Sequence, residues 1–205
     1  MPLVYQQNIN ATTRIAVWHI TEQEDFFLAV VPVQREIKHW HKRLQHLAGR
    51  LLLKELYPDF PVELIQVADT KKPFLENEPF HFSISHCGDY AAVMVSKEYR
   101  VGVDIELMNP KIEKIIPKFL TDVECFLMPR GAIASTATLF WSVKETIYKW
   151  NSRAGVDFKK HIAIRFTTGN AHEGIVHCIF NGQTELDVHF IHFNDNYLTW
   201  VLTAH

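Results

Sequence analysis

The order of elements predicted by the hydrophobic pattern is what most restricts the fold of this chain. A strand, a short helix, a long amphipathic helix and several strands are expected in the first half, and a similar order recurs in the second. The two long helical patterns lie within residues 35–58 and 139–150. We therefore expect an α+β fold of two similar α+β subdomains, residues 1–98 and 99–205, each near the usual size of about 100 residues.

The charge balance and the cysteines restrict the class of protein. The 21 basic and 23 acidic residues nearly cancel, so small molecules or proteins are expected as partners, and not nucleic acid. Three scattered cysteines without C-x-x-C spacing argue against a disulfide framework or a zinc site and fit a reducing cytoplasm. The first ten residues lack the features of a signal peptide and no apolar run reaches membrane-spanning length, so we expect a soluble, cytoplasmic chain.

Two segments have the spacing of a capping box, in which a threonine and a glutamate three residues later satisfy the first amides of a helix. They are Thr21 with Glu24 and Thr121 with Glu124. We therefore expect a short helix to begin at each of these segments.

The segment V-G-V-D-I-E, residues 101–106, alternates as a strand does and places two carboxylates on one face. Asp104 and Glu106 point the same way as Gly102, with α-carbons about 7 Å apart, so both side chains can reach one cation. On this segment alone, the solvated face of an antiparallel sheet is the simpler explanation.

The helix predicted over residues 139–150 carries two stripes at the helical period of about 100° per residue. The apolar stripe consists of Phe140, Val143, Ile147 and Trp150, and the second of Trp141, Lys144, Glu145, Tyr148 and Lys149. A solvated face with an ion pair between Glu145 and Lys149 explains the charges but leaves two aromatic side chains exposed. The wall of a ligand cleft explains both, and the two interpretations remain open.

The segment H-F-S-I-S-H-C-G, residues 81–88, is predicted to be a strand that ends in a glycine turn. Ser85, His86 and the turn amides could hold a phosphate, although a histidine at a strand end is more often structural or solvated. Upstream, Lys72 precedes a proline, which stiffens the loop that carries this lysine. The simpler interpretation of this segment is an ordinary solvated loop.

Four motifs occur in the order K-P, S-I-S-H, G-V-D-I-E and W-x-x-K-E-x-x-x-K, between residues 72 and 149. In this order the chain resembles the Sfp-type 4'-phosphopantetheinyl transferases. The resemblance implies a monomer of two halves related by a pseudo-twofold axis, with coenzyme A bound in the cleft between them. It also implies magnesium-dependent transfer of phosphopantetheine from coenzyme A to a serine of an apo acyl or peptidyl carrier protein, with release of adenosine 3',5'-bisphosphate.

The resemblance also implies a role for individual residues. The magnesium ligands would be Asp104, Glu106 and Glu145. Lys144 and Lys149 would lie against the pyrophosphate, and Trp141 would form the wall of the site. Lys72, Ser85 and His86 would bind the 3'-phosphate and adenosine side of coenzyme A. Glu124 matches an acidic position that is discussed in the family as the base for the serine hydroxyl. A capping box with Thr121 accounts for a glutamate at this position equally well.

Some positions depart from the family pattern. Gln45 stands where a basic residue is expected on the long helix of the first half, and Ser83 and Cys87 replace the asparagine and final serine of F-N-I-S-H-S. These changes bear on affinity for coenzyme A more than on catalysis. Lys111, Lys114 and Lys118 could face an acidic helix of the carrier protein or lie on an ordinary solvated face.

Two other functions fit parts of the pattern. A magnesium-dependent nuclease also uses carboxylates and a lysine, but it should carry a basic stripe, which the balanced composition does not provide. The second alternative is a non-catalytic module that keeps the fold and binds a nucleotide or a carrier protein without turnover. The intact set of acidic residues argues against this alternative.

Overall fold

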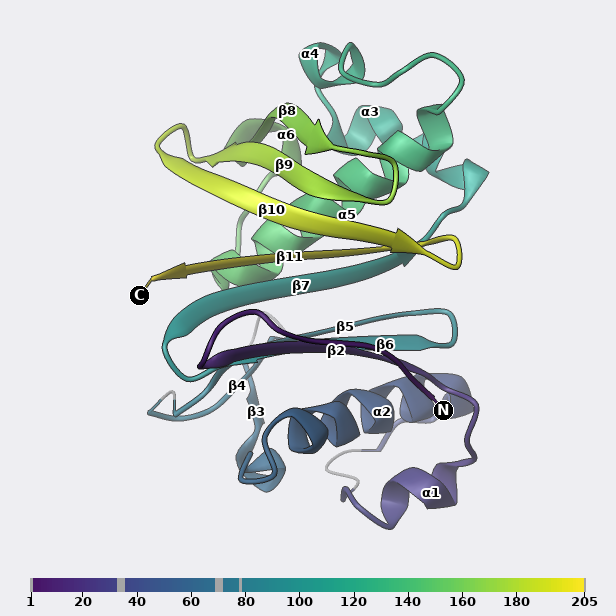
Figure 1. Cartoon of the computed structure of the whole chain (residues 1–205), viewed down its shortest axis with the longest axis vertical. Helices are drawn as coiled ribbons and strands as arrows, with labels where there is room; N and C mark the ends of the chain where they lie inside the picture. Colours follow the sequence, from purple (N-terminus) through teal and green to yellow (C-terminus); the bar gives the residue numbers. More distant parts are fainter. Residues whose placement is uncertain (1, 33–35, 69–71, 78, 205) are drawn as a thin grey trace. The chain divides into compact units, whose positions relative to one another are not determined.

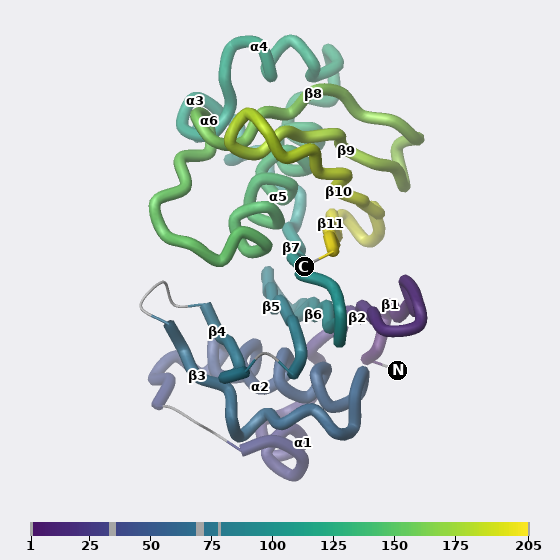
Figure 2. The backbone as a smooth tube through the Cα atoms, turned by 90° about the vertical axis from the view of Figure 1, so that its left-hand side faces the viewer, coloured from purple at the N-terminus to yellow at the C-terminus, as the bar shows by residue number. Residues whose placement is uncertain are grey.

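The computed structural model describes residues 2–32, 36–68, 72–77 and 79–204. The chain divides into two compact units, Met1–Val101 with Leu202–His205, and Gly102–Val201. Both units combine helices with an antiparallel sheet, so the fold is mixed α and β, as the sequence pattern predicts (Figure 1, Figure 2). In the described part of the chain, no helix is long and apolar enough to span a membrane.

The first unit is built on a four-stranded sheet in the order β1-β2-β6-β5, in which neighbouring strands are antiparallel. Its strands are β1 (Leu3–Asn8), β2 (Thr13–His19), β5 (His81–Cys87) and β6 (Tyr90–Ser96). Its helices are α1 (Glu24–Leu28), α2 (Trp40–Leu56) and the 3-10 helix η1 (Val62–Leu64), and β3 (Gln66–Val67) pairs with β4 (Pro73–Phe74). Residues 62–64 make a 3-10 turn, so the strand of this segment begins only at Gln66.

Helix α2 packs its leucine-rich face against this sheet and forms the core of the first unit. Leu47, Leu51 and Leu52 are almost fully buried, as their spacing predicts. Trp40 has the spacing of the same face but begins the helix and is 64% exposed. The first turn of α2 therefore extends beyond the core.

The second unit is built on a five-stranded sheet in the order β7-β11-β10-β9-β8. Its strands are β7 (Tyr99–Leu107), β8 (Ile162–Gly169), β9 (Glu173–Phe180), β10 (Thr184–Phe193) and β11 (Asn196–Ala204). Its helices are η2 (Pro110–Ile115, a 3-10 helix), α3 (Ile116–Phe119), α4 (Asp122–Cys125), α5 (Ile133–Asn151) and α6 (Phe158–His161). Short helices and loops gather near α5, which runs along the sheet (Figure 1).

Helix α5 approaches β7 so closely that the strand needs a glycine there. A Cβ atom at Gly102 would meet the carbonyl oxygen of Thr146 and lie 2.9 Å from the Cβ atom of Trp150. The apolar stripe of α5 is buried against the sheet as predicted, at Phe140, Val143, Ile147 and Trp150. This close contact brings the polar face of β7 against α5, where the candidate site lies.

Only one of the two expected capping boxes forms among the described residues. At α4 the Thr121 side chain accepts from the amide of Glu124, and the Glu124 side chain accepts from the amide of Thr121. Helix α1 instead follows Gln23 and has no side-chain cap, because it begins later than expected. Glu24 lies within its first turn and pairs with Arg43, with Nη2 to Oε2 at 2.6 Å.

Candidate functional site

Asp104 lies at the centre of the candidate site, on the face of β7 that packs against α5. Its side chain is buried, and Oδ1 lies 2.6 Å from the ammonium of Lys149. Oδ2 accepts a hydrogen bond of 2.8 Å from the hydroxyl of Ser142. Both oxygens of this carboxylate are therefore held by α5.

Ser142 belongs to a buried row of hydroxyl groups that sequence analysis did not identify. Its Oγ lies 2.8 Å from Oγ1 of Thr199 on β11, and Thr199 in turn lies 2.6 Å from Oγ1 of Thr146. These three side chains are fully buried. On a helical wheel Ser142 lies only about 20° from Lys149, which was the available signal that it faces the same strand.

Glu106 is held by an aromatic side chain of α5. The indole Nε1 of Trp141 donates to Oε1 of Glu106 over 3.0 Å. The Trp141 ring also contacts Phe119 and Phe158, with centroid distances of 5.1 and 5.6 Å. Trp141 therefore connects the acidic site to the short helices α3 and α6.

Glu145 is the third carboxylate of this face, and its charge is the least favoured. Burial, together with the negative charges of Asp104 and Glu106, raises the pKa of Glu145 to about 7, although the charge of Lys149 opposes this shift. The electrostatic effect shows that the three carboxylates lie near enough to repel one another. A bound cation would relieve this repulsion.

The three carboxylates do not form a closed metal site in this conformation. In the part of the chain that the structure describes, no group of three or more His, Cys, Asp or Glu side chains is arranged to hold a metal ion. The reason is that Asp104 is bonded to Lys149 and Ser142, and Glu106 to Trp141. The donor chemistry still suits magnesium, which prefers oxygen ligands and binds with few carboxylates together with substrate phosphates and water.

Lys144 does not occupy the position expected for a residue that contacts pyrophosphate. Its side chain is 0% exposed and its ammonium lies 2.7 Å from Oε1 of Glu124. It also donates to the backbone oxygens of Phe158 and Ile162, each over 2.9 Å. Burial lowers the pKa of Lys144, and the hydrogen bond and charge of Glu124 oppose this shift.

Glu124 does not occupy the position expected for a base that receives a proton from a substrate. It is 2% exposed and accepts from the amide and hydroxyl of Thr121, from the amide of Ile164 and from Lys144. All of its acceptor capacity faces the protein. The capping-box interpretation is the one that the structure confirms.

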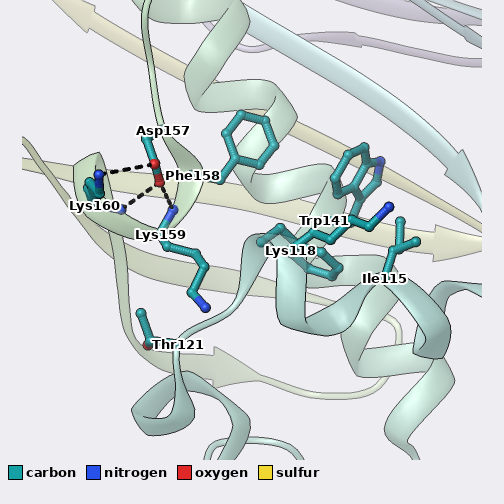
Figure 3. A pocket seen from close by; sticks show the side chains of 9 residues that line it. Ile115, Lys118, Thr121, Trp141, Asp157, Phe158, Lys159 and Lys160 are labelled. Carbon is teal, nitrogen blue, oxygen red and sulfur yellow. Dashed lines mark hydrogen bonds and ion pairs between the residues drawn. The ribbon is translucent and has the colours of Figure 1, made fainter.

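A hollow with a volume of ≈ 900 Å³ lies beside Trp141, and we call it the Trp141 hollow (Figure 3). Its lining combines aromatic and aliphatic side chains with lysines: Ile115, Lys118, Phe119, Thr121, Trp141, Asp157, Phe158, Lys159 and Lys160. Asp157 caps α6 by accepting from the amides of Lys159 and Lys160, which lower its pKa. The hollow is therefore apolar at its wall and carries an excess of positive charge.

The other expected ligand-binding residues belong to the first unit. Ser85 and His86 are consecutive near the end of β5, where Ser85 is buried and His86 is exposed. Lys72 immediately precedes β4, which contacts β5. Gln45, at the position where a basic residue was expected, donates to the backbone oxygen of Gly88 over 2.8 Å and so supports the β5–β6 turn.

The two arginines of α2, Arg43 and Arg50, have partners within the protein. Arg43 pairs with Glu24, and Arg50 is buried and bonded to His46. Lys111, Lys114 and Lys118 are all exposed on η2 and α3, and Lys118 lines the Trp141 hollow.

Comparison with known proteins relates this chain to one family. Residues 100–202, just over half of the chain, match the family model of the 4'-phosphopantetheinyl transferase superfamily. The matched residues include β7, α5 and the whole candidate site around Asp104.

Individual relatives are similar over part of their length. The 4'-phosphopantetheinyl transferase AcpT of Salmonella typhi is 37% identical over 70 residues, which cover 34% of this chain and 36% of that protein. AcpT of Escherichia coli O157:H7 is 39% identical over 70 residues, 34% of this chain and 35% of that protein. Enterobactin synthase component D of Salmonella typhi is 28% identical over 113 residues, 53% of this chain and 47% of that protein. The chain thus spans between about a third and a half of the length of these relatives, and with the family match it belongs to the 4'-phosphopantetheinyl transferase superfamily.

Proposed function

We propose that this protein transfers the 4'-phosphopantetheine group of coenzyme A to a serine hydroxyl of an apo acyl or peptidyl carrier protein. Adenosine 3',5'-bisphosphate is the other product. The observation that carries the proposal is the arrangement of Asp104, Glu106, Glu145 and Lys149 on facing surfaces of β7 and α5, within the segment that matches the family. Membership of the superfamily and the names of the AcpT relatives support the same reaction.

Magnesium is the metal that we assign to the three carboxylates. Asp104, Glu106 and Glu145 supply oxygen ligands only. The pKa of Glu145 is raised by burial and then by the charges of Asp104 and Glu106, and a cation would offset these charges. A magnesium ion supplies stabilisation of the charge that develops on phosphate oxygens as the phosphoanhydride bond breaks. Lys149, which now pairs with Asp104, lies where its ammonium can add to that stabilisation.

Binding of coenzyme A is assigned to both units. Lys72, Ser85 and His86 are proposed to bind the 3'-phosphate and adenosine side, because they supply an ammonium, a hydroxyl and an imidazole for an anion. A pseudo-twofold relation of the two halves, a coenzyme A site between them and a monomeric state belong to the same proposal. The free cysteines Cys87, Cys125 and Cys178 fit a protein of the reducing cytoplasm.

The carrier protein is proposed to approach over the Trp141 hollow. This hollow shares Trp141 with the acidic site, and Trp141 bonds to Glu106. Its lysines, Lys118, Lys159 and Lys160, would favour a negatively charged partner. The serine would then arrive close to the residues that are assigned to the metal.

The experiment is the intact mass of several apo carrier proteins after incubation with this protein, coenzyme A and magnesium, with a chelator control. One added phosphopantetheine group, only with metal, is expected for the wild-type protein and for the exposed control variant Glu173→Gln. Glu145→Gln should lower the rate by about 10²-fold or more while the protein stays folded, because it removes a charged metal ligand. Transfer by Glu145→Gln at the wild-type rate would remove Glu145 from the metal site.

A different result would reject the proposed reaction itself. If no carrier protein gains mass from a folded sample that still binds coenzyme A, the protein is a binding module of the same fold.

A further inference from the structure

The ion pair between Lys144 and Glu124 is the most deeply buried pair of charges that the structure describes. The ammonium of Lys144 has three N–H groups, and three oxygens accept them: Oε1 of Glu124 at 2.7 Å and the carbonyls of Phe158 and Ile162 at 2.9 Å. No donor is left for a ligand, and the side chain is 0% exposed. Lys144 therefore bonds to the protein and not to the substrate.

The pair joins segments that are distant along the chain. Lys144 comes from the middle of α5, and Glu124 from the first turn of α4. The carbonyls of Phe158 and Ile162 lie at the beginning of α6 and at its junction with β8. Glu124 adds a further bond to β8, because it accepts from the amide of Ile164 over 2.9 Å. One buried pair thus fixes α4, α6 and β8 on α5.

The position of α6 determines what surrounds the Trp141 ring. Phe158, whose carbonyl Lys144 holds, packs on Trp141 with a centroid distance of 5.6 Å and on Tyr148 at 6.1 Å. In Figure 3, Phe158 and Trp141 both border the Trp141 hollow. Trp141 then donates to Glu106, one of the carboxylates assigned to magnesium. The path from Lys144 to Glu106 therefore contains one hydrogen bond, one ring contact and a second hydrogen bond.

We infer that Lys144 is a positioning residue, which orients the Glu106 carboxylate through Phe158 and Trp141 and makes no contact with coenzyme A. The inference rests on the proposed function and changes the role that the family resemblance implied for this lysine. Glu124 is the counter-ion of Lys144 and shares its positioning role. Lys149, which lies on another side of α5 and bonds to Asp104, is the lysine of this helix that we assign to the phosphate.

The test is a double-mutant cycle with Lys144→Met, Glu124→Gln and the combined variant, with Lys54→Met as a control lysine on α2. A single substitution leaves a buried charge without its partner, whereas the combined variant removes both charges. We expect Lys144→Met to lower kcat and to raise the magnesium concentration for half-maximal rate by about tenfold, with the KM for coenzyme A within about twofold of wild type. The combined variant should regain the stability lost to the unpaired charge but keep the raised magnesium requirement, because methionine cannot hold the carbonyl of Phe158.

A second substitution tests the path without removing a charge from the core. Trp141→Phe keeps an aromatic ring but loses the indole N–H, so it should also raise the magnesium requirement while the thermal unfolding midpoint changes little. Magnesium binding measured by calorimetry, without any turnover, should weaken in Lys144→Met, in Trp141→Phe and in the combined variant, and recovery in the combined variant would mean that the loss came from the unpaired charge of Glu124 and not from the path. If Lys144→Met does not fold, the combined variant and Trp141→Phe still decide the inference.

Two other results would overturn the positioning role. A KM for coenzyme A raised tenfold or more in both Lys144→Met and the combined variant would mean that the ammonium contacts the ligand. Unchanged magnesium binding in a folded Trp141→Phe would mean that Trp141 does not orient Glu106. Absence of transfer by the wild-type protein would instead reject the proposed function, and the calorimetric comparison would still judge the inference.

Discussion

The raised pKa of Glu145 predicts an unusual dependence of stability on pH in the absence of metal. The pKa rises from 4.5 to about 7, so between these values the folded protein keeps a proton that the unfolded chain releases. The folded state therefore binds more protons in this window, and the free energy of unfolding falls as the pH rises through it. Glu145→Gln removes this titration, because the side-chain amide of glutamine does not ionise in this pH range.

The magnitude follows from the size of the shift. A difference of about 2.5 pH units at about 1.36 kcal/mol each gives about 3 kcal/mol, and partial exposure of the side chain reduces this to about 2–3 kcal/mol. At pH 8 without magnesium, Glu145→Gln should be more stable than wild type by this amount, or by roughly 5–10 °C in unfolding midpoint for a chain of this size. At pH 4 most of the difference should be gone, because Glu145 is then protonated in both states.

The assay is urea unfolding of wild type, Glu145→Gln and Glu173→Gln at several pH values, in chelator and in magnesium. Magnesium should stabilise the wild-type protein more at pH 8 than at pH 5, and it should stabilise Glu145→Gln less. A stability difference between wild type and Glu145→Gln that is equal at pH 4 and pH 8 would refute the reasoning, because it would not arise from titration of this carboxyl group.

Three further predictions concern packing, the acceptor and coenzyme A. Gly102→Ala should destabilise the second unit by about 2–4 kcal/mol in urea unfolding, because its methyl group has no room beside α5; a neutral result would mean that α5 can move away from β7. The double charge reversal Lys159→Glu with Lys160→Glu should raise the KM for the carrier protein about tenfold at low salt, leave the KM for coenzyme A unchanged and lose its effect at high salt; a matching rise in both constants would contradict a docking role. Alanine at Lys72 or His86 should reduce the preference for coenzyme A over its 3'-dephospho form in competition assays; equal preference in wild type and variants would exclude both residues from the 3'-phosphate site.

The main helices and strands could be predicted from the sequence because their patterns are long and regular. The apolar stripe of α5 gave the correct buried face, but the solvated face that was the simpler explanation for Asp104 in β7 is wrong, because this face is buried against α5. The element β1 was not predicted, because it consists of three apolar or aromatic residues followed by three polar ones and has no clear alternation. The failed capping box at Thr21 has a local cause, since α1 begins at Glu24, so that Gln23 and not Thr21 is the N-cap residue, and Glu24 bonds to Arg43.

The position of Lys144 shows why a helical wheel with two stripes misassigned one residue. Lys144 lies about 40° from Phe140, nearer to the apolar stripe than Trp141 or Glu145 does. Its burial depends on Glu124 and on the carbonyls of α6, and these partners are 14 to 20 residues away in the sequence. Local periodicity contains no information on such distant partners.

The hydrogen bonds in the buried row of hydroxyls between α5 and β11 all point the same way, toward Asp104. An ionised carboxylate can only accept, so Ser142 donates to Asp104, and Ser142 must then accept from Thr199, and Thr199 from Thr146. Each hydroxyl has one proton, so the charge at the start of the row favours one orientation for all three, with the backbone oxygen of Thr199, 3.3 Å from the Thr146 hydroxyl, as the second acceptor for Thr146. Asp104→Asn is therefore not a silent replacement of the same shape. An amide nitrogen turned toward Ser142 would donate, and every hydroxyl along the row would have to rotate.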